Sequence, residues 1–230
     1  MLIGIIGAMD SEINALKENI VKIKSEKISG VEFFSGKIGD KEVVVAKSGV
    51  GKVFAAICVE AMILKYHPDK IFHIGIAGAL SSDLGVKDVV IASSVAQHDI
   101  DQTAFNMPRG FIQGLELIEI PCTKSLVNEL ESCAKKLNVN YKTGLIVSGD
   151  QFINDEKIKT NITKDFDAIA VEMEGAATGQ VCHVNGVDFC VIRAMSDAAD
   201  DSSSETYKIS KFCSSDVATK IILEYLYEFN

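Results

Sequence analysis

Short apolar segments of strand length alternate with longer segments of helical periodicity along most of this chain. The strand-length segments lie at residues 2–7, 31–35, 42–48, 70–75, 88–96, 143–148, 168–172 and 187–194. Helices are expected at residues 11–18, 52–66, 124–137, 155–163, 174–183 and 206–227. Because several strands are apolar throughout, both faces of the sheet must be covered. The pattern therefore predicts an α/β fold of three layers, with a twisted, mostly parallel or mixed central sheet flanked by helices.

No feature of the sequence divides the chain into separate units. Its 230 residues are 47% apolar and 24% charged, which suits one globular domain spanning residues 1–230. Only three prolines occur, and no stretch rich in Pro, Gly or Ser is long enough to act as a linker. Residues 97–119 are the least regular stretch and include three apolar side chains that look exposed, so we expect a long functional loop or a contact surface there.

Charge and cysteine usage exclude several classes of function. The formal net charge is −9, and only Arg109 and Arg193 of the 23 cationic residues are arginines, so we expect no nucleic-acid partner. No apolar run reaches the roughly 20 residues of a membrane span, and no leader pattern is visible, so we expect a cytoplasmic protein without a membrane partner. The six cysteines form no C-x-x-C pair and lie mostly in apolar segments, which indicates reduced, buried thiols and no bound metal.

The glycine-rich segment at residues 48–52 is not a phosphate-binding P-loop. That motif requires a glycine where Ala46 stands and a serine or threonine where Val53 stands. The other glycine pairs are only G-x-x-G, short of a dinucleotide-binding fingerprint. Tight turns are the better interpretation, although a glycine turn also admits a ligand closely.

Polar side chains collect where the predicted strands end. Glu172 and Glu174 flank one methionine after an apolar strand, and Ser196 and Asp197 follow the strand that holds Arg193. In open α/β sheets, ligands bind in the crevice outside the carboxyl ends of the strands. The sequence therefore predicts a pocket at this edge, lined by carboxylates, a hydroxyl and a cation.

Seven blocks in order along the chain give a specific resemblance to a known family. The sequence resembles the 5′-methylthioadenosine/S-adenosylhomocysteine nucleosidases, within the nucleoside phosphorylase superfamily. The blocks after position 170 are similar to those of purine nucleoside phosphorylases as well, whereas the Gly-Ala-Met-x-x-Glu block separates the two groups. The matching blocks are Gly4–Met9 with Glu12, Ser48–Lys52, Gly75 with Ala77 and Gly78, Ser148–Asp150 with Phe152 and Ile153, Val171–Glu174, Arg193, and Ser196 with Asp197.

The resemblance implies a single-domain α/β homodimer that needs no metal or cofactor. Its activity would be irreversible hydrolysis of the adenine N-glycosidic bond in 5′-methylthioadenosine, S-adenosylhomocysteine and also 5′-deoxyadenosine, as part of methionine salvage and the methyl cycle. Glu12 would activate the attacking water, and Asp197, held by Ser196, would assist protonation of adenine N7. Phe152 would stack on adenine, and the backbone of Ile153 would read its Watson–Crick edge.

The same resemblance assigns residues to the sugar and to the 5′ group. Glu174 would bind the ribose hydroxyls, Met173 would pack on the sugar, and Arg193 would help to position water and carboxylates. Ala77 and Gly78 would border the substrate. The apolar residues matched to the 5′-alkylthio pocket are Met9, Val50, Tyr207 and, contributed across the dimer, Phe105.

Elementary chemistry supports a role for two separated carboxylates. Cleavage of an N-glycosidic bond passes through an oxocarbenium-like state, so the purine must be protonated on one side while water arrives on the other. By analogy with inverting glycosidases, we expect the carboxyl groups of Glu12 and Asp197 to stand about 6.5 to 9.5 Å apart. The first turn of a helix favours the ionised form of Glu12, and burial of Asp197 would favour its protonated form.

Two rival functions predict different outcomes. A phosphorylase would share the fold and the purine contacts, but phosphate requires several fixed cations, and Glu12 would repel it. A binding module would hold an adenine nucleoside and release no free adenine.

The preference among 5′ groups, including a futalosine-type group, stays open because residues 106–119 match the family poorly. Ile76 stands where many relatives carry a small hydroxyl residue near the reactive water.

Overall fold

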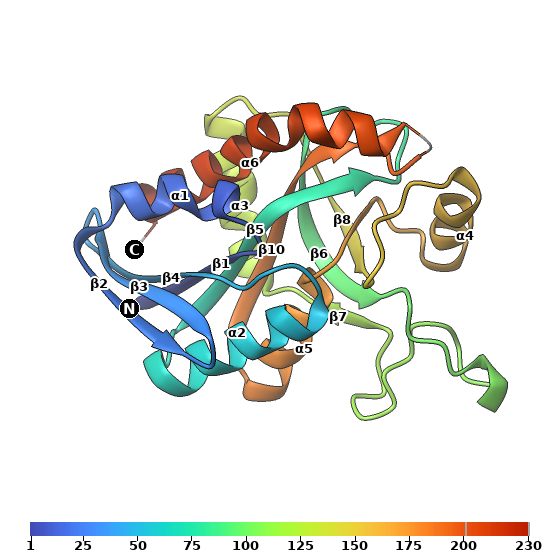
Figure 1. Cartoon of the computed structure of the whole chain (residues 1–230), viewed down its shortest axis with the longest axis horizontal. Helices are drawn as coiled ribbons and strands as arrows, with labels where there is room; N and C mark the ends of the chain where they lie inside the picture. The colour runs from blue at the N-terminus through green and yellow to red at the C-terminus, as the bar shows by residue number, and fades with distance from the viewer. Residues whose placement is uncertain (201, 230) are drawn as a thin grey trace.

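The computed structural model describes residues 1–200 and 202–229, except for the side chains of residues 209 and 211–213 (Figure 1). The strands are β1 (Leu2–Gly7), β2 (Val21–Ile28), β3 (Val31–Ile38), β4 (Lys41–Lys47), β5 (Lys70–Ala79), β6 (Val89–Gln97), β7 (Glu119–Pro121), β8 (Tyr141–Ser148), β9 (Ala170–Glu172) and β10 (Asp188–Asp197). The helices are α1 (Asp10–Asn19), α2 (Lys52–Tyr66), α3 (Lys124–Lys136), α4 (Glu156–Phe166), α5 (Gly175–Asn185) and α6 (Ser203–Glu228), with a 3₁₀ turn at Thr103–Phe105.

These strands form one mixed sheet, as the apolar segments predicted. The order along the sheet is β10-β6-β8-β9-β5-β1-β4-β3-β2, and β7 pairs with β6. An additional pairing joins β10 to β5, so β5, β10, β6, β8 and β9 close into a ring at one end of the sheet. The α/β class and the mixed sheet are confirmed, and this local closure is a feature that the hydrophobic pattern did not predict.

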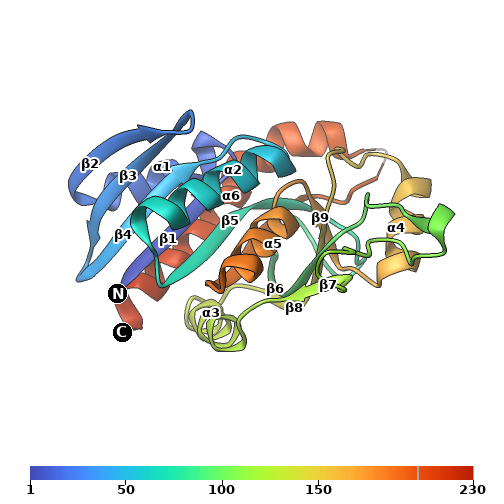
Figure 2. The same ribbon diagram turned by 90° about the horizontal axis from the view of Figure 1, so that it is seen from below.

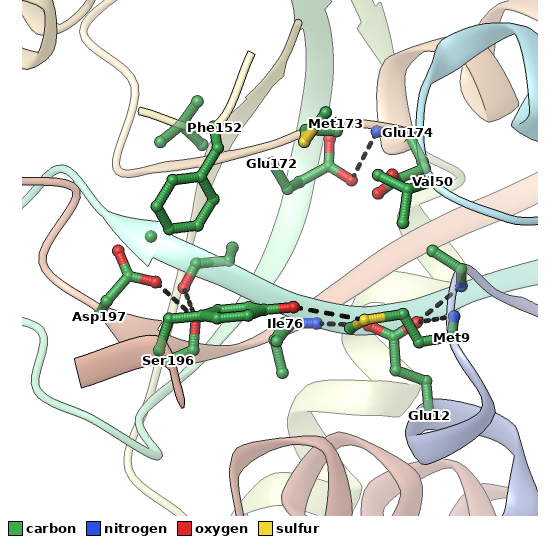
Figure 3. A pocket seen from close by; sticks show the side chains of 15 residues that line it. Met9, Glu12, Val50, Ile76, Phe152, Glu172, Met173, Glu174, Ser196 and Asp197 are labelled. Carbon is green, nitrogen blue, oxygen red and sulfur yellow. Dashed lines mark hydrogen bonds between the residues drawn. The ribbon is translucent and has the colours of Figure 1, made fainter. Parts of the chain in front are cut away.

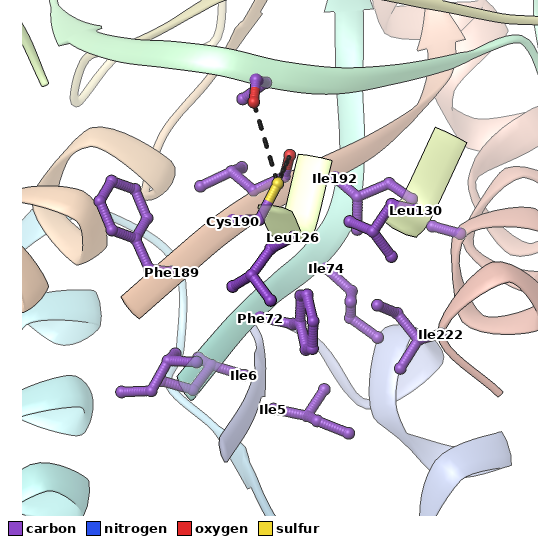
Figure 4. Packing of buried hydrophobic residues seen from close by; sticks show 14 of the residues in the cluster. Ile5, Ile6, Phe72, Ile74, Leu126, Leu130, Phe189, Cys190, Ile192 and Ile222 are labelled. Carbon is purple, nitrogen blue, oxygen red and sulfur yellow. Dashed lines mark hydrogen bonds between the residues drawn. The ribbon is translucent and has the colours of Figure 1, made fainter. Parts of the chain in front are cut away.

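Helices cover both faces of the sheet. Helix α6 packs against α1, α3, β5 and β10, whereas α2 packs against α5 on the opposite face (Figure 2). Side chains from β1, β5, β10, α3 and α6 converge in the main core (Figure 4). The central strands are buried almost throughout, because each carries an apolar side chain toward both layers. The five cysteines whose side chains are described are buried with free thiols, as expected.

The sequence pattern missed the strands β2 and β7. Seven of the eight residues of β2 are exposed, and its sequence VKIKSEKI is rich in lysine, because it forms the outer edge of the sheet. Strand β7 has only three residues and ends at Pro121, so it shows no periodicity. Within residues 97–119 the described structure is mostly irregular, and the 3₁₀ turn projects away from the body of the molecule (Figure 1).

Strand directions bring two sets of carboxyl ends together. Strands β1, β4, β5 and β10 run in one direction, and β6, β8 and β9 run in the other. Strand β9 pairs antiparallel with the last residues of β5, with Gly78 opposite Val171 and Ala79 opposite Ala170. The ends of both sets therefore meet at one place, and the polar residues that follow them share one site.

Candidate active site

A pocket of about 470 Å³, open to solvent on one side, lies where these strand ends meet (Figure 3). Its lining comes from strand ends and connections that are far apart in the sequence. The lining residues are Ala8, Met9, Glu12, Val50, Ile76, Ala77, Gly78, Phe152, Val171, Glu172, Met173, Glu174, Ser196, Asp197 and Tyr207.

Glu12 reaches the pocket from the first turn of α1. One carboxylate oxygen accepts hydrogen bonds from the backbone N–H groups of Ala8 and Met9 at 2.6 and 2.9 Å, and the other accepts from Ile76 N–H at 3.1 Å. A Cβ atom on Gly75 would lie 2.6 Å from Glu12 Oε1, so only glycine leaves space for this carboxylate.

The pKa of Glu12 differs from the expectation for a helix terminus. Burial raises the pKa of Glu12, although the Arg193 guanidinium and the three N–H donors oppose that shift. Desolvation therefore outweighs the helix terminus, which on its own favours ionisation. A raised pKa makes the ionised Glu12 a better proton acceptor.

Asp197 is buried, as expected, at the end of β10. Ser196 Oγ donates to Asp197 Oδ2 at 2.7 Å, and Ala199 N–H donates to Oδ1 at 2.9 Å. A Cβ atom on Gly78 would stand 3.0 Å from Asp197 Oδ1, so this glycine also makes room for a carboxylate. Figure 3 shows Glu12 and Asp197 on opposite sides of the same pocket.

Glu172 and Arg193 form a buried ion pair that sequence reasoning did not identify. Arg193 Nη2 and Nε lie 2.5 and 3.1 Å from Glu172 Oε2. Glu172 also accepts hydrogen bonds from Ser148 Oγ and from the N–H groups of Glu174 and Gly175. Since Arg193 is 1% exposed and does not line the pocket, it contacts a carboxylate and not the cavity itself. The sequence placed Glu172 and Arg193 near the same edge of the sheet, but it carried no signal for the pairing itself, which depends on the strand order.

Glu174 lies two residues farther on and has a different environment. Its Oε1 accepts a hydrogen bond from Gly51 N–H at 2.8 Å, and its side chain lines the pocket. Burial, with further repulsion from Glu172, raises the pKa of Glu174 to about 8. A protonated Glu174 has a hydrogen to donate as well as oxygens to accept, which suits a pair of sugar hydroxyls.

Apolar side chains form the rest of the pocket and its rim. Phe152 and Tyr207 meet edge to face, with ring centroids 5.5 Å apart, and Tyr207 Oη lies 3.4 Å from Met9 Sδ. Phe152 is 44% exposed and Val50 is 50% exposed. An aromatic face at an open rim suits a planar heterocycle, and the sulfur and aliphatic groups beside it suit an apolar substituent.

Two other predicted residues lie outside the lining. Ile153 is buried, follows Phe152 directly and does not line the pocket. Its contact with the Watson–Crick edge of adenine through the backbone stays a prediction. Phe105 is 78% exposed on the projecting 3₁₀ turn, in a separate surface hollow with Gln102, Met107 and Gln113. Within one copy of the chain, Phe105 therefore does not contribute to the pocket.

The electrostatics of the pocket favour cationic over anionic reaction partners. Four carboxylates line it, those of Glu12, Glu172, Glu174 and Asp197, and none of the described lining residues is a lysine or an arginine. Among the described residues, no group of three His, Cys, Asp or Glu side chains is arranged to hold a metal ion. Glu12 and Asp197 thus lie on opposite sides of the cavity, and Arg193 neutralises the charge of Glu172.

Comparisons with known proteins agree with this geometry. Residues 2–225 match the model of the phosphorylase superfamily. A 5′-methylthioadenosine/S-adenosylhomocysteine nucleosidase of Staphylococcus haemolyticus is 42% identical over 200 residues, which cover 86% of this chain and 87% of that protein. The nucleosidase of Shewanella pealeana is 42% identical over 204 residues, covering 88% and 89% of the two chains.

Solved structures extend the likeness over the whole chain. The S-adenosylhomocysteine nucleosidase of Streptococcus pyogenes, in complex with 5-methylthiotubericidin, has a TM-score of 0.96 at 32% identity and covers 100% of this chain and 98% of that one. The futalosine hydrolase of Helicobacter pylori has a TM-score of 0.96 at 35% identity, with the same coverage. Both the sequence relatives and these structures support one assignment. The chain belongs to the 5′-methylthioadenosine/S-adenosylhomocysteine nucleosidase family of the phosphorylase superfamily.

Proposed function

We propose that this protein is an N-glycosyl hydrolase that releases adenine from 5′-methylthioadenosine and S-adenosylhomocysteine. The observation that carries the proposal is the pair of carboxylates, Glu12 and Asp197, on opposite sides of one pocket that has no cation among its described lining residues. Names and bound ligands of the relatives support the same substrates.

The reaction divides between the two carboxylates. Asp197, oriented by the Ser196 hydroxyl, assists protonation of adenine N7, so that the purine leaves as a neutral molecule. Ionised Glu12 accepts a proton from the attacking water on the other side of the sugar. Its three backbone N–H contacts fix the direction of the carboxylate before the water arrives. Glu174 binds the ribose hydroxyls, Met173 packs on the sugar, and Phe152 stacks on adenine.

Hydrolysis is favoured over phosphorolysis by charge. A phosphate dianion beside ionised Glu12 would be repelled, and the buried cation Arg193 is already bound to Glu172. A pocket of this charge suits an oxocarbenium-like sugar, which is positive in the transition state. Water is therefore the better nucleophile here.

The test is to incubate the protein with 5′-methylthioadenosine and to follow free adenine, with and without phosphate. Release of adenine at equal rates in both conditions supports hydrolysis. A strict requirement for phosphate would assign a phosphorylase. Saturable binding of the nucleoside without any free adenine would assign a binding module.

Substrate preference is a finer proposal that rests on the apolar rim. Val50, which is matched to the 5′-alkylthio pocket, is 50% exposed, so the 5′ end of the pocket is open within one copy. We expect this opening to accept the long 5′ substituent of S-adenosylhomocysteine as well as methylthio and hydrogen groups. Parallel assays with 5′-methylthioadenosine, S-adenosylhomocysteine, 5′-deoxyadenosine and futalosine rank the preferences directly.

A homodimer is supported by an apolar surface on α2 and α5. Five large apolar side chains of these two helices are between 40% and 68% exposed. Single exposed apolar residues are common, whereas a group of them marks an interaction surface. The five residues are Val53, Phe54, Ile57, Leu64 and Val184. A second copy would cover them, and the projecting turn could then bring Phe105 to the neighbouring pocket. Sedimentation of wild type and Phe54→Glu tests the dimer, which predicts a halved mass for the variant.

The proposed setting is methionine salvage in the cytoplasm. Both products of the reaction, adenine and a thio-sugar, are small polar molecules that other cytoplasmic enzymes must consume. Among the described residues no helix is long and apolar enough to cross a membrane. Fractionation of cells, with adenine release as the readout, tests the location.

A further inference from the structure

Three connections of the chain meet behind one wall of the pocket. They are the β4–α2 connection at Lys52, the end of β6 at Asp99, and the β8–α4 connection at Asp150. Their polar groups form a closed set of hydrogen bonds, which we call the Lys52–Asp99–Asp150 network. None of these three residues lines the pocket, so they do not contact the substrate there.

The network has one bond between each pair of its members. Lys52 Nζ lies 2.5 Å from Asp99 Oδ1. Asp150 N–H donates to Asp99 Oδ2 at 3.0 Å, and Lys52 N–H donates to Asp150 Oδ1 at 2.8 Å. A further bond joins Lys52 Nζ to Gln97 Oε1 at 2.9 Å, and Gln97 in turn donates to Gln180 at 2.6 Å. The Gln97 amide is thereby oriented with its oxygen toward Lys52.

Two of the three connections held by the network, those at Lys52 and at Asp150, also carry a residue of the pocket. Val50 lines the pocket two residues before Lys52, and Gly51 N–H is the hydrogen-bond donor of Glu174. Phe152 lines the pocket two residues after Asp150. The network therefore links the segment that carries Gly51, the hydrogen-bond donor to Glu174, with the segment that carries Phe152, the residue proposed to stack on adenine.

The β4–α2 connection has little rigidity of its own. Gly49 and Gly51 have φ values of 95° and 102°, a region that glycine enters freely and other residues avoid. A Cβ atom on Gly51 would lie 3.1 Å from Asp150 Oδ1, so the two connections approach closely. A segment with two such glycines requires outside contacts to hold one conformation.

Partial burial makes the Lys52–Asp99 ion pair stronger than ion pairs on the surface. The side chains of Lys52 and Asp99 are 16% and 27% exposed, whereas those of Lys65, farther along α2, and Glu26, on β2, are both 49% exposed. Burial alone would raise the pKa of Asp99, but hydrogen bonds from Lys52 and Asp150 outweigh it and hold that pKa below its usual value. Asp99 is therefore charged at neutral pH, and attracts Lys52 with less screening than an exposed carboxylate.

We propose that the Lys52–Asp99–Asp150 network is a positioning device that fixes the spacing between Gly51 and Phe152 on two sides of the nucleoside pocket. It acts through these residues and touches no reacting atom. The proposal rests on the proposed function for its kinetic readout, and on ligand binding for an independent one. Loss of the network should weaken nucleoside binding more than it slows the chemical step, because Glu12 and Asp197 are held by other contacts.

The experiment compares Lys52→Met, Asp99→Asn and Lys52→Arg with Lys65→Met. The Lys65 variant is the matched control, since it removes the same side chain from the same helix and breaks only the exposed pair with Glu26. Thermal melting first establishes that each variant is folded. KM and kcat for 5′-methylthioadenosine are then measured, with the Kd for methylthio-immucillin-A, the ligand of the Neisseria meningitidis nucleosidase structure, measured by calorimetry.

For Lys52→Met and Asp99→Asn we expect KM and Kd to rise about tenfold, with kcat changed less than about threefold. Lys52→Arg should stay within about threefold of wild type, because its guanidinium is able to reach both Asp99 and Gln97. Lys65→Met should match wild type.

Wild-type KM and Kd in both Lys52→Met and Asp99→Asn would overturn the proposal. An equal rise in Lys65→Met, or a fall in kcat larger than the rise in KM, would overturn it as well. If the wild-type protein releases no adenine, the proposed function fails on its own, and the Kd values still decide whether the network positions the pocket.

Discussion

Glu12 and Glu172 are both buried glutamates beside the same pocket, yet their surroundings differ. Glu172 is bound by Arg193, by Ser148 and by two backbone N–H groups, so its charge is neutralised inside the protein. Glu12 has three backbone N–H donors and no cation bound directly to it, and burial raises its pKa. Burial alone therefore does not distinguish a reactive carboxylate from a structural one, and the partner of each carboxylate does.

The difference also explains how four carboxylates share one small pocket. Arg193 pairs with Glu172 and also lowers, through space, the pKa values of Glu12 and Glu174, which burial raises. One guanidinium thus fixes one carboxylate and moderates two others. Glu12 should therefore matter mainly for activity and the Glu172–Arg193 pair mainly for stability. Substitutions at the two places should affect different measurements.

The largest expected effect is the loss of activity in Glu12→Gln. Glutamine keeps one acceptor oxygen, enough for the N–H groups of Ala8 and Met9 but not for that of Ile76. It is unable to take a proton from water, so we expect kcat/KM to fall about 10⁴-fold. The free energy of unfolding should stay within about 1 kcal/mol of wild type, since the variant removes a desolvated charge. Adenine release and urea denaturation measure the two quantities. Activity within tenfold of wild type would assign the proton transfer elsewhere.

The reverse outcome is expected for Arg193→Met. Glu172 would stay buried without its cation, and we expect the free energy of unfolding to fall by about 3 to 5 kcal/mol. The control is Arg109→Met, which breaks ion pairs with Asp101 and Asp165 that are roughly half exposed, and should cost less than about 1 kcal/mol. Urea denaturation of both variants gives the comparison. Equal losses would show that burial of the pair adds nothing.

The separation of these two regions could be predicted only in part from the sequence. Strand-end positions predicted that Glu174, Ser196 and Asp197 face a common pocket, and the family resemblance added Glu12; all four line it. The apolar segments likewise predicted most of the sheet, because buried strands must be apolar on both faces. The exposed edge strand β2 had no such constraint on its sequence, and was missed.

The pattern of apolar and polar residues could not predict side-chain pairings between segments that are far apart in the sequence. The bond between Arg193 and Glu172 depends on β9 pairing antiparallel with the end of β5 while β10 pairs parallel with it. Strand order of this kind is set by the whole fold, and periodicity within one segment carries no record of it. For the same reason, the helix terminus predicted an ionised Glu12 without the opposing effect of burial.

A smaller kinetic effect is expected for Asp197→Asn. Asparagine keeps a contact with Ser196 but has no carboxyl group to assist protonation of adenine N7, so kcat should fall about 10²-fold. KM should change little, because Phe152 and Glu174 are untouched. Single-turnover assays of adenine release separate the chemical step from binding. Ordinary turnover in this variant would remove Asp197 from the protonation step.

The smallest effect, and the sharpest test of how the neighbouring carboxylates Glu172 and Glu174 differ, is the pH dependence of stability. The pKa of Glu174 is about 8 in the folded protein, against an ordinary value of 4.5 for a glutamate side chain. Between these pH values the folded state holds a proton that the unfolded state releases, so stability falls as pH rises from about 4.5 to 8 and levels off above. Glu174→Gln removes this contribution.

The unfolding free energy of Glu174→Gln minus that of wild type should therefore increase by more than about 1 kcal/mol between pH 5 and pH 8. All other titrating groups cancel in this difference, to the extent that the substitution leaves them unchanged. Urea denaturation at several pH values measures it, and Glu156→Gln, at a side chain that is 61% exposed, supplies the surface control. A difference for Glu174→Gln that stays constant with pH would mean that Glu174 is ionised in the folded protein, and that Arg193 neutralises both glutamates rather than Glu172 alone.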